Sequence, residues 1–173
     1  MASTNIRATT DDTYDFSMLI RNVDGLQVSS SHLGFVSDAA VLIYPEATND
    51  PIDNLFFSNV VIDNSGYAIR CAQPTGYTGN LLDINFVNGL VEFSTNNAIH
   101  LECPSLYNFN IPGMVYLRNE KAGLWANAGT RIKAQNSIFI WNNTANGGSN
   151  HVTLLGTVMD VNFDGSSYTT GNG

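Results

Sequence analysis

The feature that most constrains this chain is an internal repeat that runs from Asn54 to Gly129. Each copy holds a short apolar run, a corner, a second run, an Asn-containing turn and a third run. The three copies read NLFFSNVVIDNSGYAIRC (54–71), NLLDINFVNGLVEFSTNNAIHLEC (80–103) and YNFNIPGMVYLRNEKAGLWANAG (107–129). A repeat of roughly 20–50 residues indicates a solenoid or a repeat array, because one copy cannot bury its apolar face alone. We therefore expect the copies to stack upon one another.

Two sets of positions recur along the chain and fix the length of each copy. We place the corners between first and second runs at Asn22, Asn59, Asn88, Pro112 and Asn136. We place the inward residues of the third runs at Val41, Ile69, Ile99, Leu124 and Val152. The chain has 22 Asn and 15 Gly residues, which predicts many tight corners, because both residue types tolerate left-handed backbone.

The runs themselves have the character of β-strands. They are short, rich in Val, Ile and Phe, and bounded by Gly or Asn, which is typical of strands. Successive side chains of a strand point to opposite faces. From this alternation we expect the inward residues of the second runs to be Val60 and Ile62, Val91 and Phe93, Val115 and Leu117, and Ile138 and Ile140. No window has convincing helical periodicity, so the predicted class is all-β.

The same alternation predicts three columns of outward side chains along the stack. Beside the second runs we expect Gln27, Val61, Glu92, Tyr116 and Phe139. Beside the third runs we expect Leu42, Arg70, His100, Trp125 and Thr153. Beside the first runs we expect Leu19, Phe56, Asp83, Asn110 and Lys133. Function on a solenoid depends on what these outward columns present.

The outward column of the second runs is apolar and predicts a subunit interface. Val61, Tyr116 and Phe139, with Trp141 near by, would form one exposed patch. Large exposed apolar patches mark partner surfaces, so we expect these four residues to lie in an oligomer interface. The alternative is that loops of the same chain cover them.

The outward column of the third runs predicts a carbohydrate site. Arg70, His100 and Trp125 combine an aromatic surface with polar neighbours, and a sugar ring binds to an apolar platform flanked by hydrogen-bonding groups. We therefore assign these three residues to glycan binding. The alternative is a solvated surface with one packed tryptophan.

Catalytic and metal-binding signals are weak. The rung carboxylates Asp63, Asp83, Glu92 and Glu102 form no DxD or DxxxD cluster, and hydrolases need two carboxylates at a defined separation. The three His residues are far apart and there is no CxxC motif, so no metal-ligand spacing is recognised. We name no catalytic residue, no metal ligand and no cofactor.

The two cysteines occupy equivalent places in the repeat. Cys71 and Cys103 each close a third run, and each is followed shortly by proline. We interpret them as free, buried thiols. The alternative is a disulfide between neighbouring turns, because strands about 4.8 Å apart lie near the short end of disulfide geometry.

Composition and charge exclude two kinds of partner. The net charge is −8 and only 13% of the residues are charged. Nucleic-acid phosphates require a basic face, and an anionic membrane surface would be repelled in the same way. No apolar stretch approaches 18 residues, so no membrane-spanning segment is expected. The N-terminus lacks the basic-then-apolar order of a signal peptide.

The chain divides into three parts by composition. Residues 1–15 are polar and without periodicity, which indicates an arm or a cap. The repeat pattern covers 16–163, and the Gly/Ser/Thr-rich segment 164–173 is interpreted as a flexible tail.

These features together resemble a known family of folds. Short strands in triplets, Asn at a recurring corner and the third runs SGYAIRC, NNAIHLE and KAGLWAN resemble the right-handed parallel β-helix shared by pectate-lyase-like enzymes and bacteriophage tailspikes. The resemblance covers 16–163 and implies five to six rungs. It also implies a ladder of corner Asn side chains, which Pro112 would break unless the corner is shifted there.

The resemblance leads to two functional expectations. The first is a non-enzymatic virion surface protein, a spike, fibre or capsid-decorating homotrimer that contacts other virion proteins and host surface polysaccharide. The second is a small or truncated polysaccharide lyase or hydrolase. Absent carboxylate clusters and an apolar outer column favour the first, so we expect a location on the virion surface.

Overall fold

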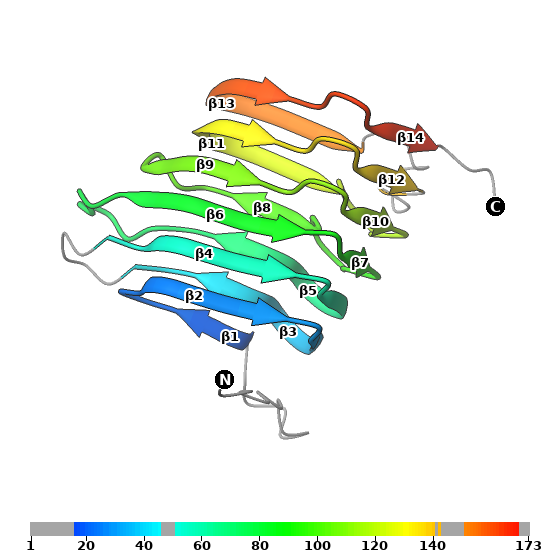
Figure 1. Ribbon diagram of the computed structural model, residues 1–173, viewed down its shortest axis with the longest axis horizontal. Coiled ribbons are helices and arrows are strands. Elements are labelled where there is room, and N and C mark those ends of the chain that lie inside the picture. Colours follow the sequence, from blue (N-terminus) through cyan, green and yellow to red (C-terminus); the bar gives the residue numbers. More distant parts are fainter. Residues whose placement is uncertain (1–15, 46–50, 141, 143–150, 170–173) are drawn as a thin grey trace.

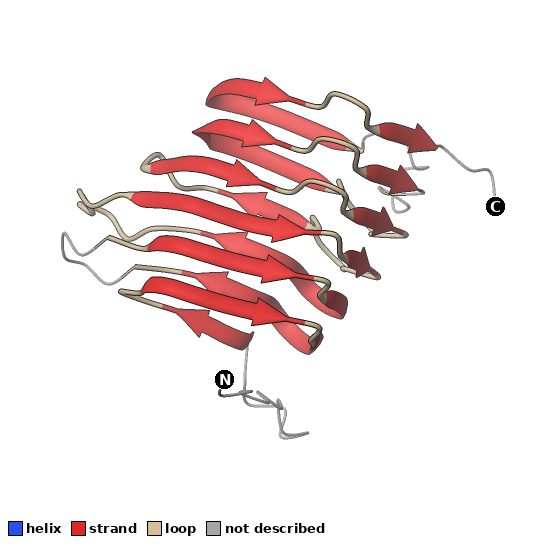
Figure 2. Ribbon diagram, in the orientation of Figure 1, coloured by secondary structure: helices blue, strands red, loops and turns tan. Residues whose placement is uncertain are grey.

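A computed structural model describes residues 16–45, 51–140, 142 and 151–169. These residues form fourteen β-strands and no helix, and the strand pairs are parallel. The strands stack as a parallel β-solenoid of about five turns (Figures 1 and 2). The predicted all-β solenoid is confirmed. Within the described part of the chain, no helix is long and apolar enough to cross a membrane.

Each turn contributes to three faces, which correspond to the first, second and third runs of the repeat. The first-run face contains β2 (Asp24–Ser29), β4 (Asp53–Ser58), β6 (Leu81–Val87) and β9 (Leu106–Asn110). The second-run face contains β7 (Leu90–Glu92), β10 (Val115–Leu117), β12 (Ile138–Ile140) and β14 (Ser167–Thr169). The third-run face contains β1 (Phe16–Ile20) and β8 (Ile99–Leu101).

Four longer strands bend around a corner and contribute to two faces each. They are β3 (His32–Ile43), β5 (Val61–Cys71), β11 (Leu124–Lys133) and β13 (Val152–Asn162). The strands β3 and β5 join the second-run face to the third-run face, whereas β11 and β13 join the third-run face to the first-run face. In Figure 1 the stack has β1 at one end and β13 and β14 at the other.

The inner lining of the third-run face has the predicted register. Its column consists of Val41, Ile69, Ile99, Leu124 and Val152. The first four of these side chains are fully buried, and burying one such aliphatic side chain stabilises the fold by about 1.5–3 kcal/mol. Aromatic residues line the first-run face in the same manner, where the rings of Phe57 and Phe86 stack at 4.3 Å. The stacked columns therefore form one continuous core.

The corner between first and second runs is a column of left-handed residues. Its members all have positive φ, and the N–H of each of the first five donates to the carbonyl just before the corner of the next turn: Ser30, Asn59, Asn88, Gly113, Asn136 and Gly165. Two expected corners were wrong, since Gly113 replaces Pro112 and Ser30 replaces Asn22. Proline fixes φ near −65° and cannot adopt this conformation. At Gly113 a Cβ atom would lie 2.3 Å from Oδ1 of Asn88, so a side chain there would require the Asn88 amide to move.

This corner sets the inward and outward positions of every second run. The third residue after it points inward, and in the four second runs whose fifth residue is described, that residue adopts positive φ again and turns the chain onto the third-run face. The fifth-position residues are Phe35, Asn64, Phe93 and Arg118. Phe93 is therefore a corner residue with 40% of its surface exposed, and its predicted inward position was wrong.

In two of the second runs, counting from the corner exchanges the predicted inward and outward side chains. Val60, Ile62 and Val91 are buried as expected. In the later turns, however, Tyr116 and Phe139 point inward and are fully buried. The expected inward residues there are the flanking ones: Val115, Leu117 and Ile140 are half-buried and Ile138 is exposed. A shift of one residue moves every side chain of a strand to the opposite face.

Two further differences concern the first-run face and the end of the solenoid. The outward first-run column consists of Gln27, Phe56, Asn85, Asn110, Lys133 and Asn162, so the expectation that Gln27 lies beside a second run was wrong. Asp83 is instead a left-handed residue next to this column, and Leu19 pairs with Leu42 on the third-run face. Ser167–Thr169, placed in the tail by composition, form β14 and pair with β12.

Candidate functional site

The predicted outward column of the third-run face is present in the structure. It consists of Leu42, Arg70, His100, Trp125 and Thr153, in register on five successive strands. These side chains point outward because each alternates with the inward lining of the same strand. We call Arg70, His100 and Trp125, with the flanking Asp38 and Glu102, the outer row.

An aromatic stack forms the centre of the outer row. The imidazole of His100 and the indole of Trp125 are parallel within 4°, with ring centroids 4.1 Å apart. The ring of Tyr67 meets His100 at a tilt, 4.9 Å between centroids. On the other side of Trp125 the neighbouring residue is Thr153, whose small side chain cannot cover an indole. Trp125 is half-buried.

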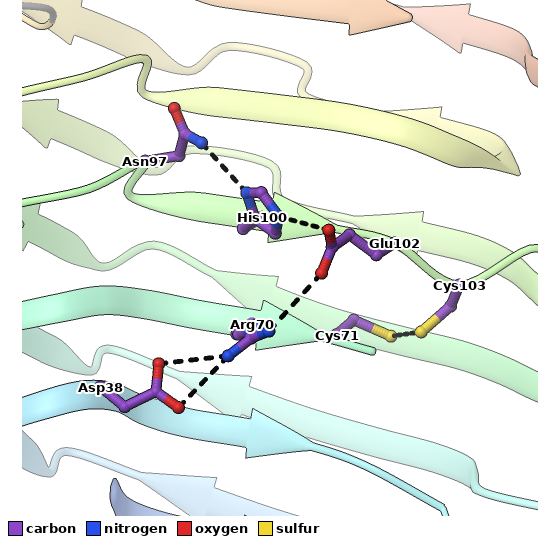
Figure 3. A network of polar contacts seen from close by, with 7 residues as sticks. All are labelled: Asp38, Arg70, Cys71, Asn97, His100, Glu102 and Cys103. Atoms are coloured by element: carbon purple, nitrogen blue, oxygen red, sulfur yellow. Dashed lines mark hydrogen bonds and ion pairs between the residues drawn. The ribbon is translucent and has the colours of Figure 1, made fainter. Parts of the chain in front are cut away.

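An ion-pair network lies beside the aromatic stack (Figure 3). Nη1 of Arg70 lies 3.3 Å from each carboxylate oxygen of Asp38, and Nη2 lies 3.7 Å from Oε2 of Glu102. The guanidinium also sits over the ring of Tyr67, 5.3 Å from its centroid. All three charged side chains are partly exposed, so each pair adds at most about 1 kcal/mol to stability. Their main effect is to fix where the charges lie.

The hydrogen bonds of His100 define its tautomer. Oδ1 of Asn97 accepts from the backbone N–H of Ala122 at 3.2 Å, which leaves its amide N–H to donate to Nδ1 of His100 at 3.0 Å. The proton of the neutral ring must then reside on Nε2, which lies 3.1 Å from Oε1 of Glu102. Both ring nitrogens therefore have a partner.

The protonation state of His100 follows from its surroundings. Burial lowers its pKa below the usual value, and the charges of Arg70 and Lys121 lower it further, while the hydrogen bond and charge of Glu102 oppose the shift. The ring is therefore neutral at physiological pH. Both nitrogens are engaged and the ring is packed against Trp125 and Tyr67, so the imidazole is held in one orientation.

Two residues that contact Arg70 or His100, namely Asp38 and Asn97, were not predicted from the sequence. Asp38 lies in SSSHLGFVSDA, a stretch that resembles an insertion in the first turn, but the structure includes it in β3. Asn97 sits in the turn before β8. Asn97 could have been found from its position three residues before His100, whereas Asp38 lies on the neighbouring turn and could not be aligned with Arg70 from the sequence.

The predicted interface residues lie in different environments. Tyr116 and Phe139 are fully buried and stack on each other at 4.6 Å, and Phe139 also stacks on Tyr168 at 5.2 Å. The expectation that these two rings are exposed was wrong, because they belong to the inner lining of the second-run face. Val61 is half-buried on the outer side, and Trp141 lies outside the described residues.

The four carboxylates considered for catalysis lie in different environments. Asp63 lies 3.0 Å from Nε2 of His32, and Asp83 accepts a hydrogen bond from the side chain of Asn108 at 2.9 Å. Glu92 is half-buried at the end of β7, and Glu102 belongs to the outer row. Across residues 16–45, 51–140, 142 and 151–169, no group of three His, Cys, Asp or Glu side chains could hold a metal ion.

The fold and the site together define a parallel β-solenoid that carries an aromatic and charged row on one face. Comparison with protein-family models, with curated proteins and with solved structures found no match to this chain. Its function is therefore argued from the residues of the outer row.

Proposed function

We propose that this chain is a non-enzymatic binding protein that recognises carbohydrate through the outer row, in the setting of a virion surface. The observation that carries the proposal is the stack of His100 on Trp125 beside two carboxylates. Sugar rings place their apolar C–H faces against an aromatic ring while their hydroxyls bond to polar side chains. The outer row offers aromatic rings and polar side chains close to one another.

The charges of the outer row favour neutral sugars. Asp38 and Glu102 pair with Arg70, His100 is neutral, and the charge of Lys121 also acts on His100. Two cations therefore match the two carboxylates locally, and the repulsion of anions comes from the whole chain, whose net charge is −8. An acidic glycan would be repelled, whereas the hydroxyls of a neutral sugar can donate to the carboxylate oxygens.

The rigidity of the outer row also supports binding. Arg70, His100 and Trp125 project from strands that are hydrogen-bonded to the turns before and after them. The amide of Asn97 holds the imidazole in one orientation. Little side-chain entropy is then lost when a ligand binds, which raises affinity for a given set of contacts.

Binding of neutral oligosaccharides tests the proposal. Titration calorimetry with chitotetraose, cellotetraose and maltotetraose should detect binding to at least one of them, and Trp125→Ala should weaken it about tenfold or more, because a stacked aromatic contributes roughly 1.5 kcal/mol or more. Tyr107→Ala is the matched control, since Tyr107 is 42% exposed on the first-run face. An equal loss of affinity in both variants, or binding only to acidic oligosaccharides, would contradict the proposal. Cleavage of the oligosaccharide would contradict the proposal that the protein is not an enzyme.

The virion setting is supported by the resemblance of this repeat to bacteriophage tailspikes, together with the parallel solenoid itself. A homotrimer is the expected assembly, and its interface would use residues other than the buried Tyr116 and Phe139. Sedimentation equilibrium should give three times the chain mass of 18.7 kDa. A monomer at micromolar concentration would contradict the trimer. Carbohydrate binding is tested separately by the calorimetric titration.

A further inference from the structure

Two cysteine side chains meet inside the solenoid next to the outer row. Cys71 is the last residue of β5, and Cys103 follows β8 on the next turn (Figure 3). Both are free thiols, both are fully buried, and their Sγ atoms lie 2.6 Å apart. A disulfide bond is about 2.05 Å long, so a small movement of the two side chains brings the sulfur atoms to bonding distance.

We propose that Cys71 and Cys103 are an oxidation site at which a disulfide links two adjacent turns of the solenoid. The backbone already holds the two segments together, because Cys71 pairs with Leu101 and its carbonyl accepts from the N–H of Glu102 at 2.8 Å. A bond between them therefore needs no rearrangement of the strands. This inference stands apart from carbohydrate binding and does not depend on it.

The oxidant is a low-molecular-weight disulfide such as glutathione disulfide. One cysteine thiolate attacks a sulfur atom of glutathione disulfide, which forms a mixed disulfide and releases one glutathione thiolate. The second cysteine thiolate then attacks the protein sulfur of the mixed disulfide and releases the other glutathione thiolate. The two protons lost by the cysteines go to the two glutathione thiolates, so the protein loses two electrons and the glutathione gains them.

The surroundings of the thiols decide when this reaction takes place. Burial raises the pKa of the Cys103 thiol, and contact with Cys71 and the charge of Glu102 raise it further. Thiolate is the reactive form, so the folded, covered pair reacts slowly. The disulfide forms while the turns assemble, and the same burial then shields it from reductants.

The location gives the disulfide a structural effect on the outer row. It closes a loop between positions 32 apart and joins the two strands that carry Arg70 and His100, with Glu102 beside Cys103. A cross-link of this loop size constrains the unfolded chain and should raise the midpoint of thermal unfolding by roughly 5–15 °C.

Refolding from denaturant with and without glutathione disulfide tests this inference. After refolding, the protein is denatured, alkylated with iodoacetamide and weighed by mass spectrometry. The oxidised sample should carry no carbamidomethyl groups, whereas the sample refolded in dithiothreitol should carry one on each cysteine. The oxidised sample should also unfold at the higher temperature.

The variant Cys71→Ser/Cys103→Ser is the control, because its unfolding midpoint should not respond to glutathione disulfide or to dithiothreitol. Circular dichroism must show the same β-sheet signal in all samples. Two alkylated cysteines in folded protein that was refolded with glutathione disulfide would overturn the inference. A disulfide-linked dimer on a non-reducing gel, in place of the intramolecular bond, would overturn it equally.

Discussion

At the scale of single residues, His100 shows how the repeat fixes the orientation of an ordinary side chain. The side chains of Asn97 and Glu102 engage its two ring nitrogens, and Trp125 covers one ring face. Each partner comes from the same turn or from the next one. A residue that titrates near neutral pH in water is held neutral here by burial.

The lowered pKa of His100 predicts an acid-sensitive fold. The unfolded chain takes up a proton near pH 6.5, the usual value for histidine, whereas the folded chain takes it up only at lower pH. Stability is therefore complete above about pH 6.5 and declines as the pH falls from there toward the folded pKa. Burial lowers the pKa of His151 as well, which acts in the same direction.

Thermal unfolding between pH 8 and pH 5 measures this effect. His100→Phe keeps a ring against Trp125 but cannot titrate, so the decline in its unfolding midpoint over this interval should be smaller than that of the unaltered chain. His151→Phe is a companion variant that removes the second contribution. An identical decline in all three proteins would show that neither histidine is responsible.

At the scale of single strands, the left-handed corner decides which side chains enter the core. The corner residue Gly113 follows Pro112, and the first and third positions after it are Met114 and Tyr116, both fully buried. The same count from Asn136 places Phe139 inside. Side-chain type alone favours Ile138 and Ile140 as the inward pair, and this is where the sequence interpretation went wrong.

A pair of alanine variants tests the register of β12. Phe139→Ala removes a fully buried ring that is stacked on both sides, so it should lower the free energy of unfolding by about 3–5 kcal/mol. Ile138→Ala removes a side chain that is 39% exposed, and it should cost less than about 1 kcal/mol. Urea denaturation followed by circular dichroism measures both. The reverse order of effects would show that the strand faces the other way.

The difference between the third runs and the second runs explains what could be predicted from the sequence and what could not. The third-run column was correct throughout, because Ile69, Ile99 and Leu124 mark it with the same residue class in each copy of the repeat. The outward neighbours Arg70, His100 and Trp125 followed from it directly. The prediction failed in several second runs because their corner residue varies between Asn, Gly and Ser. A one-residue error at the corner exchanges the inward and outward faces of the strand.

The partners within the site were beyond sequence reasoning for a different reason. Asp38 contacts Arg70 from 32 positions earlier in the chain, and the length of each turn must be known before such a pair can be aligned. The turns are unequal, since successive corners at Ser30, Asn59, Asn88 and Gly113 are not evenly spaced. Contacts between turns therefore require the structure.

At the scale of the whole molecule, the solenoid turns a short repeat into straight rows of side chains. Stability comes from columns of buried apolar residues shared between neighbouring turns, and each turn depends on the ones above and below it. The outward rows are a consequence of the same stacking. The outer row, the proposed carbohydrate site and the cysteine pair all depend on β5, β8 and β11 being in register.

Detecting the stack of His100 on Trp125 in solution is the most direct test of whether β8 and β11 are in register. The chain has two tryptophans, so Trp141→Phe leaves Trp125 as the single indole in the spectrum. With ring centroids 4.1 Å apart, a two-dimensional nuclear Overhauser spectrum of this variant should show cross-peaks between the imidazole protons of His100 and the indole protons of Trp125. A folded variant whose indole shows cross-peaks to other side chains but none to His100 would contradict the register, and with it the outer row.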